Sequence, residues 1–365
     1  MKFYVDKSEL LNSLSAVSMG MSARSTMPIL SGILLIVADG ELTLRTTDLE
    51  KSVQNQVAVL VESEGETVVP GRLFTDIIKN FPEASVSIEH DGVSLNIISD
   101  ESTFSVTTMD PLDYPVFPVI DKNKQVTISA RDLQRMIKKA AKAISRDESR
   151  PVLKGVLVKI ESGRLSMVAT DSYRLAVVDR EIDNDADFEL IVPGDILEEV
   201  AKISSQEDLV TITEAENQIM FEVGRSIFIS RKIEGSYPNY AALIPSDKVL
   251  SAVINTSELL SAVRRVSVAS HQNGPIKMAF DPDGQKLVVS SRTIDRASGS
   301  VSIPAQIDGD YLEIGFNHQY IADGLSVIDE EEISFETQGA MKAGVIKAAK
   351  EDSFLYLTMP LRVDA

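Results

Sequence analysis

The amino-acid sequence predicts an α+β protein made of three copies of one domain, each with two helices packed on antiparallel sheet. Near residues 10, 133 and 259 the chain begins the same order of elements: an amphipathic helix, a hairpin, a second helix, further strands and an exit that contains proline. The predicted strands are rich in Val, Ile, Thr and Phe, which favour sheet. A repeat of this length is a duplicated domain, because solenoid repeats are only roughly 20 to 50 residues long.

Glycines in the predicted hairpin turns align the three copies. Gly40 and Gly163 are 123 residues apart, and Gly284 follows 121 residues later. Each glycine lies between two apolar runs, which is a strong hairpin signal. A Thr-Asp pair follows the hairpin at residues 47–48 and again at 170–171. We interpret this pair as a turn device, because Asp and Thr side chains bond readily to nearby backbone groups.

Each copy also begins and ends in a similar way. The first helices start with a capping side chain three residues before an acid: Asp6 before Glu9, Ser129 before Asp132, and Asn255 before Glu258. The exits carry Pro115, Pro238 and Pro360. We therefore expect three domains, at residues 1–121, 122–247 and 248–365. The junctions are short and polar, so the domains should pack rigidly.

The composition is that of a soluble globular protein. The 365 residues include no Cys, which excludes disulfides and thiolate metal sites and fits a reducing compartment. The longest apolar runs are far too short to span a bilayer, and residues 1–6 do not resemble a signal peptide because a charge interrupts them at once. We expect a cytoplasmic protein.

The net charge of −19 argues against nucleic acid on its own, but the distribution of the charge carries more information. The predicted helix at 129–146 carries six bases: Arg131, Arg135, Lys138, Lys139, Lys142 and Arg146. At 3.6 residues per turn they form a stripe of roughly 100° opposite the apolar face. Such a stripe is either an ordinary solvated face or a surface for DNA phosphates.

No catalytic or metal site is expected. The three His residues fall in unrelated parts of the repeat, with no zinc-binding spacing. The sequence has no nucleophile elbow, phosphate loop or dinucleotide motif. We predict no catalytic residue, metal or cofactor, so the protein is not an enzyme.

Six motifs spread over the whole chain support one family when they are taken together. They are MKF at 1–3, TMPIL at 26–30, ATDSYRL at 169–175, GSYPNY at 235–240, GFN at 315–317 and MPLR at 359–362. With them the chain resembles the bacterial beta sliding clamps, the processivity subunits of the replicative DNA polymerase. The resemblance implies three domains of the DNA-clamp fold in a ring-shaped homodimer. Helices would line a central hole, and antiparallel sheets would lie outside.

The resemblance also implies three kinds of site. DNA contacts are expected at Arg24, Arg72, Lys79, Arg131, Arg135, Lys138, Lys142, Arg146, Arg150, Arg264 and Arg265, of which Arg150 rests on the resemblance alone. A pocket for partner peptides would be lined by Leu153, Thr170, Tyr173, Arg174, Leu175, Pro238, Ala242, Leu243, Leu357, Met359, Pro360, Leu361 and Arg362. Val268 and Ala269 would lie at the dimer interface.

We therefore predict a sliding clamp that encircles duplex DNA independently of its sequence and tethers the polymerase by topology. Its expected partners are a second copy of the chain, the clamp loader, replicative and translesion polymerases and repair proteins, the last three through short linear peptides; no membrane partner is expected. Two alternatives stay open at this point. One is a carbohydrate-active enzyme of repeated α+β domains, and the other is a peptide-binding scaffold that does not bind DNA.

Overall fold

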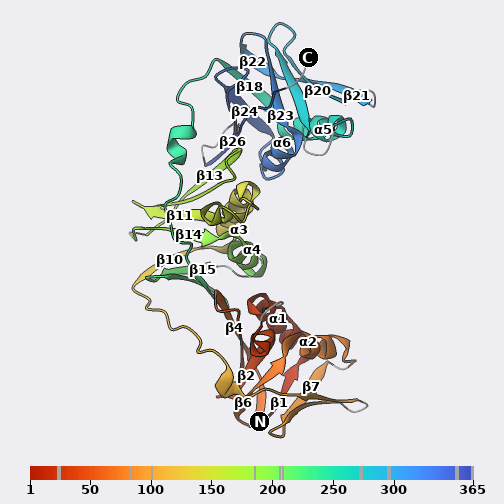
Figure 1. Cartoon of the computed structure of the whole chain (residues 1–365), viewed down its shortest axis with the longest axis vertical. Helices are drawn as coiled ribbons and strands as arrows, with labels where there is room; N and C mark the ends of the chain where they lie inside the picture. The colour runs from red at the N-terminus through yellow and green to blue at the C-terminus, as the bar shows by residue number, and fades with distance from the viewer. Residues whose placement is uncertain are drawn as a thin grey trace. The chain divides into compact units, whose positions relative to one another are not determined.

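The computed structural model describes residues 1–22, 26–82, 84–99, 102–184, 186–204, 207, 209–270, 274–293, 297–349 and 353–362. The chain forms two compact units. The first comprises Met1–Gln134 and Asp195–Lys232, and the second comprises Arg135–Gly194 and Ile233–Ala365. Each unit therefore holds one terminal repeat and half of the middle repeat (Figure 1).

The first unit contains two antiparallel sheets. The five-stranded sheet has the order β5 (Leu60–Ser63), β1 (Lys2–Asp6), β7 (Ser85–His90), β8 (Ser94–Ile98) and β9 (Thr103–Thr107). The eight-stranded sheet has the order β10 (Lys124–Ser129), β15 (Leu209–Glu214), β16 (Gln218–Val223), β17 (Ser226–Arg231), β4 (Lys51–Ala58), β3 (Glu41–Thr47), β2 (Gly32–Ala38) and β6 (Gly65–Pro70). Because β17 pairs with β4, one hydrogen-bonded sheet continues from the first repeat into the middle repeat.

The second unit is built in the same way. Its nine-stranded sheet has the order β14 (Phe188–Pro193), β11 (Gly155–Glu161), β12 (Arg164–Thr170), β13 (Arg174–Glu181), β26 (Phe354–Thr358), β25 (Gly344–Ala348), β24 (Glu332–Thr337), β18 (Leu250–Asn255) and β22 (Gln306–Gly309). Its four-stranded sheet has the order β21 (Ala297–Pro304), β20 (Lys286–Thr293), β19 (Pro275–Asp281) and β23 (Leu312–Asn317). Here β13 of the middle repeat pairs with β26, the last strand of the third repeat, with Arg174 opposite Thr358.

Six helices complete the described fold, two from each repeat. They are α1 (Lys7–Val17), α2 (Gly71–Asn80), α3 (Ala130–Ala140), α4 (Gly194–Ile203), α5 (Thr256–Ser267) and α6 (His318–Leu325). The predicted caps are confirmed. The Asp6 carboxylate accepts from the amides of Ser8 and Glu9, the Ser129 hydroxyl accepts from Asp132 N at 3.4 Å, and the Asn255 side chain accepts from Glu258 N at 3.0 Å.

The helix predicted at 129–146 is shorter in the structure. It ends at Ala140 and is followed by a three-residue 3-10 turn, Ala141–Ala143. Beyond this turn the amide of Ser145 donates to Leu153 O at 3.0 Å, which draws the chain away from the helix axis. Arg146 therefore lies outside the helix, and the predicted stripe is correspondingly shorter.

Within each unit, two helices lie side by side and cover sheet (Figure 1). In the first unit α1 contacts α2, β3 and β4, and buries Leu10, Leu14 and Val17 completely. In the second unit α5 contacts α6, β20 and β21. Burial of each large apolar side chain stabilises the fold by about 1.5 to 3 kcal/mol, so these helix faces are a main source of stability.

The helices of the described part of the chain are all too short or too polar to cross a membrane.

The contact between α6 and β26 leaves no room for a side chain at Gly324. A Cβ atom there would lie 2.5 Å from the ring of Tyr356, which is fully buried. We expect Gly324→Ala to destabilise the protein by about 1 to 3 kcal/mol through overpacking, seen as a lower thermal midpoint. Ser261→Ala, on the exposed face of α5, is the control and should leave the midpoint unchanged. An unchanged midpoint for Gly324→Ala would contradict this packing.

Candidate functional site

The second unit contains a cavity of about 470 Å³ where the middle and third repeats meet. Three segments line it: the end of β12 with the turn into β13, the loop at 242–246, and the β24–β25 turn together with β26 and Met359. Eight predicted pocket residues are brought together here, namely Thr170, Tyr173, Arg174, Leu175, Ala242, Leu243, Leu357 and Met359. They come from positions as far apart in sequence as 170 and 359, so the pairing of β13 with β26 creates the site.

The other five predicted residues do not line this cavity. Leu153 is buried in a 3-10 turn, Pro151–Lys154. The chain after β26 turns along β23, because the amide of Leu361 donates to Gly315 O at 2.8 Å. This path takes Pro360, Leu361 and Arg362 out of the lining, and Pro238 lies exposed before the loop that forms the second wall.

Seven lining residues were not predicted. Ser172, Ile244, Pro245 and Ser246 lie within three positions of predicted residues in the sequence. Gln338, Lys342 and Ala343 come from the β24–β25 turn, which reaches the cavity only because β25 pairs with β26. No sequence signal marks that turn, because its position depends on long-range strand register.

The wall formed by residues 170–174 is a tight, hydrogen-bonded turn. The Asp171 Oδ1 atom accepts from Tyr173 N at 2.9 Å and from Arg174 N at 3.0 Å. The Thr170 hydroxyl donates to Arg174 O at 2.7 Å. Ser172 takes a positive φ of 78°. The Thr-Asp pair is therefore a turn device, as the sequence predicted.

The first repeat contains the same turn. The Asp48 Oδ1 atom accepts from Glu50 N at 3.0 Å and from Lys51 N at 2.8 Å. The Thr47 hydroxyl donates to Lys51 O at 2.9 Å, and Leu49 has a φ of 77°. The match extends to individual hydrogen bonds, so the two repeats share this turn as a structural unit.

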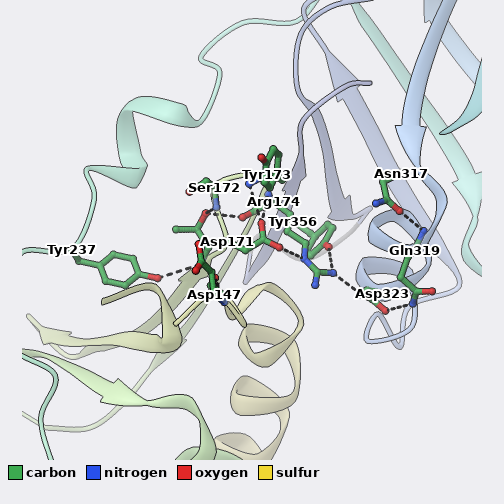
Figure 2. A network of polar contacts seen from close by, with 12 residues as sticks. Asp147, Asp171, Ser172, Tyr173, Arg174, Tyr237, Asn317, Gln319, Asp323 and Tyr356 are labelled. Carbon is green, nitrogen blue, oxygen red and sulfur yellow. Dashed lines mark hydrogen bonds and ion pairs between the residues drawn. The ribbon is translucent and has the colours of Figure 1, made fainter. Parts of the chain in front are cut away.

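Arg174 lies at the centre of a polar network on the cavity wall (Figure 2). Its Nε atom donates to Asp171 Oδ2 at 2.9 Å and its Nη1 atom donates to Asp323 Oδ2 at 2.5 Å. Its guanidinium carbon also lies 4.4 Å from the centre of the Tyr320 ring, a cation–π contact. Two carboxylates therefore balance its charge, and its side chain is only 14% exposed. Arg174 joins β13 to helix α6.

The predicted DNA-contact residues lie mainly on helices. On α3, Arg131, Arg135 and Lys138 are exposed, and Lys142 is half-buried in the 3-10 turn that follows. Arg72 and Lys79 are exposed on α2, and Arg264 and Arg265 are exposed at the end of α5. Arg146 and Arg150 are exposed in the loop after α3, where Arg150 donates to the Ser172 hydroxyl at 2.8 Å. Arg24 lies outside the described residues.

The bases of the helices differ from the lysines of the sheets. Many strand lysines are paired with a glutamate, as in Lys124–Glu214, Lys159–Glu161, Lys277–Glu313 and Lys347–Glu336. Within the described ranges, no carboxylate forms an ion pair with Arg131, Arg135, Lys138, Arg264 or Arg265. The charges of these five residues are thus available to a ligand, whereas those of many strand lysines are already balanced.

Two edge strands carry exposed surface. The strand β9 is the edge of the five-stranded sheet, and its Phe104 is 44% exposed. The strand β21 is the edge of the four-stranded sheet, beside the end of α5. The predicted interface residue Val268 follows α5 and is 86% exposed, while Ala269 is half-buried. An exposed valine next to an unpaired edge is typical of a protein contact.

No group of three or more His, Asp or Glu side chains in the described ranges is placed to hold a metal ion.

Models of known protein families show the family to which the chain belongs. Three domain models of one protein match the chain in succession: the DNA polymerase III beta subunit N-terminal domain at residues 1–118, its central domain at 127–239 and its C-terminal domain at 241–362. The chain belongs to the beta sliding clamp family. Members of this family are non-catalytic processivity factors of DNA polymerase III, and this chain has that function. The carbohydrate-active alternative is therefore wrong.

Individual sliding clamps support the assignment over the whole length. The beta sliding clamp of Bacillus subtilis is 32% identical over 377 residues, covering 99% of this chain and 100% of the relative. That of Staphylococcus aureus is 32% identical over 375 residues, covering 99% of each chain. The crystal structure of the B. subtilis clamp superimposes with a TM-score of 0.96, and that of a Pseudomonas aeruginosa clamp bound to griselimycin with 0.94 at 27% identity; each comparison covers both chains completely.

The Arg174 network should contribute measurably to the stability of this clamp. Removal of the guanidinium in Arg174→Ala leaves Asp171 and Asp323 without their shared partner, and we expect a loss of up to about 3 kcal/mol. The double variant Arg174→Ala/Asp323→Ala removes one of the two carboxylates that lose their partner, and it should recover part of the lost stability. Denaturant unfolding of the native chain, the single variants and the double variant tests this. Strictly additive changes would show that Arg174 and Asp323 do not interact.

Proposed function

We propose that two copies of the chain close into a ring around duplex DNA, and that exposed bases on α3 and α5 contact the DNA phosphates. This proposal rests on the difference in ion pairing between the basic residues of the helices and the lysines of the strands. A chain with a net charge of −19 would repel DNA as a whole. In the described part of the chain, Arg131, Arg135, Lys138, Arg264 and Arg265 have no ion-pair partner, whereas many strand lysines do, and this difference concentrates the attraction on the helices. Contacts of this kind are independent of sequence and depend strongly on salt, which suits a ring that slides.

We further propose that the edge strands β9 and β21 close the ring, each pairing with the other strand of the second copy. Two such contacts give a closed dimer, and both unpaired edges are then covered. Phe104 on β9 and Val268 beside β21 supply apolar area for the contact. We also propose that the chain divides into three domains, at residues 1–121, 122–247 and 248–365.

We propose that the cavity receives short peptides of the proteins that the clamp tethers: the clamp loader, replicative and translesion polymerases and repair proteins. Its size and its mixture of apolar side chains with a few polar groups are typical of a ligand site. Leu175, Leu243 and Leu357 supply apolar surface. Within the described ranges Lys342 has no ion-pair partner, so the cavity favours a peptide with a carboxylate beside its apolar side chains. We also propose that the protein acts in the cytoplasm, since it contains no cysteine.

Retention on circular DNA tests the ring. A ring loaded onto a nicked circle should stay bound and should be lost when the circle is cut, because it then slides off the ends. Equal loss from circular and linear DNA would contradict encirclement. The measurement is the fraction of protein that remains with DNA after gel filtration.

Charge reversal tests the helix surface. Arg135→Glu/Lys138→Glu on α3 should weaken DNA binding and lower its salt dependence by about two phosphate contacts. The matched control is Lys277→Glu/Lys286→Glu, which makes the same change in net charge at lysines that pair with Glu313 and Asp281 on the sheet. Equal effects of the two double variants would show that the helix surface has no special role and would favour a peptide scaffold that does not bind DNA.

A charge at the proposed interface should open the ring. Val268→Glu places a carboxylate in a contact that excludes water, and we expect the solution mass to fall from dimer to monomer at micromolar concentration. Val249→Glu is the control, because Val249 is also exposed in the second unit but lies at the start of β18. A native chain that is monomeric at all concentrations would contradict the proposed dimer.

A further inference from the structure

Tyr237 does not line the cavity, but it forms a hydrogen bond with one of the cavity walls, the turn at Thr170–Arg174. The hydroxyl of Tyr237 accepts a hydrogen bond from Thr170 N at 3.1 Å (Figure 2). The ring of Tyr237 packs against a buried cluster that includes Leu157, Leu175 and Leu357, so the hydroxyl has a fixed position. Burial raises the pKa of the phenol above its usual range, so the group stays protonated at all physiological pH values.

Thr170 needs this acceptor. The residue is only 3% exposed, so water does not reach it readily. A buried amide without a partner is costly, because it has given up its hydrogen bonds to water. The Thr170–Arg174 turn can relieve that cost only by moving, and four of its five residues line the cavity.

The first repeat contains the same hydrogen-bonded tyrosine. Tyr114 precedes Pro115 as Tyr237 precedes Pro238. The Tyr114 hydroxyl bonds to the backbone of Thr47, and it also lies 3.3 Å from the carbonyl oxygens of Gly32 and Arg45. Burial raises the pKa of this phenol as well. The tyrosine and the turn that it holds are therefore part of the repeated fold, and the turn of the first repeat belongs to the other unit.

Each of the two turns also accepts a hydrogen bond from a main-chain amide of a neighbouring segment. Met359 N donates to Tyr173 O at 2.8 Å, and Arg231 N donates to Glu50 O at 2.9 Å. The side chains at these positions differ. Tyr173 and Met359 line the cavity, whereas Glu50 and Arg231 form an exposed ion pair of 3.8 Å. A shift of the turn therefore changes a binding surface in the second unit but only an ion pair in the first.

We propose that Tyr237 is a positioning residue for partner binding: its hydroxyl holds the Thr170–Arg174 turn in the shape that the cavity needs. This inference rests on the proposed role of the cavity as the peptide site. The hydroxyl touches no ligand, and its effect passes through Thr170. Removal of the hydroxyl makes the turn less ordered. The binding free energy of a partner then includes the cost of ordering the turn, so binding is weaker.

The test compares Tyr237→Phe with Tyr114→Phe. Each variant loses one hydroxyl that holds the same turn, so both should lower the thermal midpoint, and Tyr114→Phe at least as much because its hydroxyl also lies 3.3 Å from two carbonyl oxygens. The dissociation constant of griselimycin, used as the probe, should rise about 5-fold for Tyr237→Phe, as expected for one hydrogen bond, and stay unchanged for Tyr114→Phe. Hydrogen exchange should speed up at residues 170–174 in the first variant and at 47–51 in the second.

A third variant separates the inference from the proposed function. Leu243→Arg places a charge in the cavity and should abolish binding of the probe if the cavity is the site. Failure of the native chain to bind, or binding that Leu243→Arg leaves intact, would overturn the role of the cavity and the inference with it. Loss of binding in Leu243→Arg with an unchanged dissociation constant in Tyr237→Phe would overturn the inference alone. If the dissociation constant rises equally in Tyr237→Phe and Tyr114→Phe, both effects result from a general loss of stability, and the inference is overturned.

Discussion

The pairing of strands between repeats is the interaction on which the rest of the structure depends. Two main-chain ladders, β4 with β17 and β13 with β26, join the three repeats into continuous sheets. Each ladder satisfies backbone groups that would otherwise be unpaired at an exposed edge. The second ladder also brings the C-terminal strand beside the turn at Thr170–Arg174, which makes a cavity from parts of two repeats. The cavity is thus a consequence of how the sheets are joined.

Side-chain pairing supports the same junctions. Arg174 bonds Asp323 of α6, and Lys51 lies 3.4 Å from Glu199 of α4, so in both cases the base that follows the Thr-Asp turn reaches an acid on the second helix of the next repeat. Both bases are mostly shielded, with side-chain exposures of 14% and 16%. Carboxylates neutralise the bases at the junctions and many strand lysines. Among the described residues, Arg131, Arg135, Lys138, Arg264 and Arg265 on the helices therefore remain as available positive charge.

Local features could be predicted from the sequence, and long-range features could not. The caps at Asp6, Ser129 and Asn255, the hairpins and the Thr-Asp turn depend on a few neighbouring residues, and the sequence predicted them. The end of α3 was missed because it depends on a bond from Ser145 to Leu153. Lys342 was missed for a similar reason, since the register of β25 with β26 decides where its turn lies. Arg174 was predicted at the cavity, but neither the spacing nor the residue type revealed that Asp323 balances its charge.

Comparison of the two junctions separates their common scaffold from the side chains that are particular to the cavity. The turn, its tyrosine and the amide donated by the following main chain are the same at both junctions. The side chains that differ include Tyr173 with Met359 at one junction, and Glu50 with Arg231 at the other. A hydrated ion pair offers little to an apolar ligand, whereas an aromatic ring and a thioether offer adaptable contact area. The copied scaffold therefore supplies the geometry, and the side chains that it carries decide the chemical character of each surface.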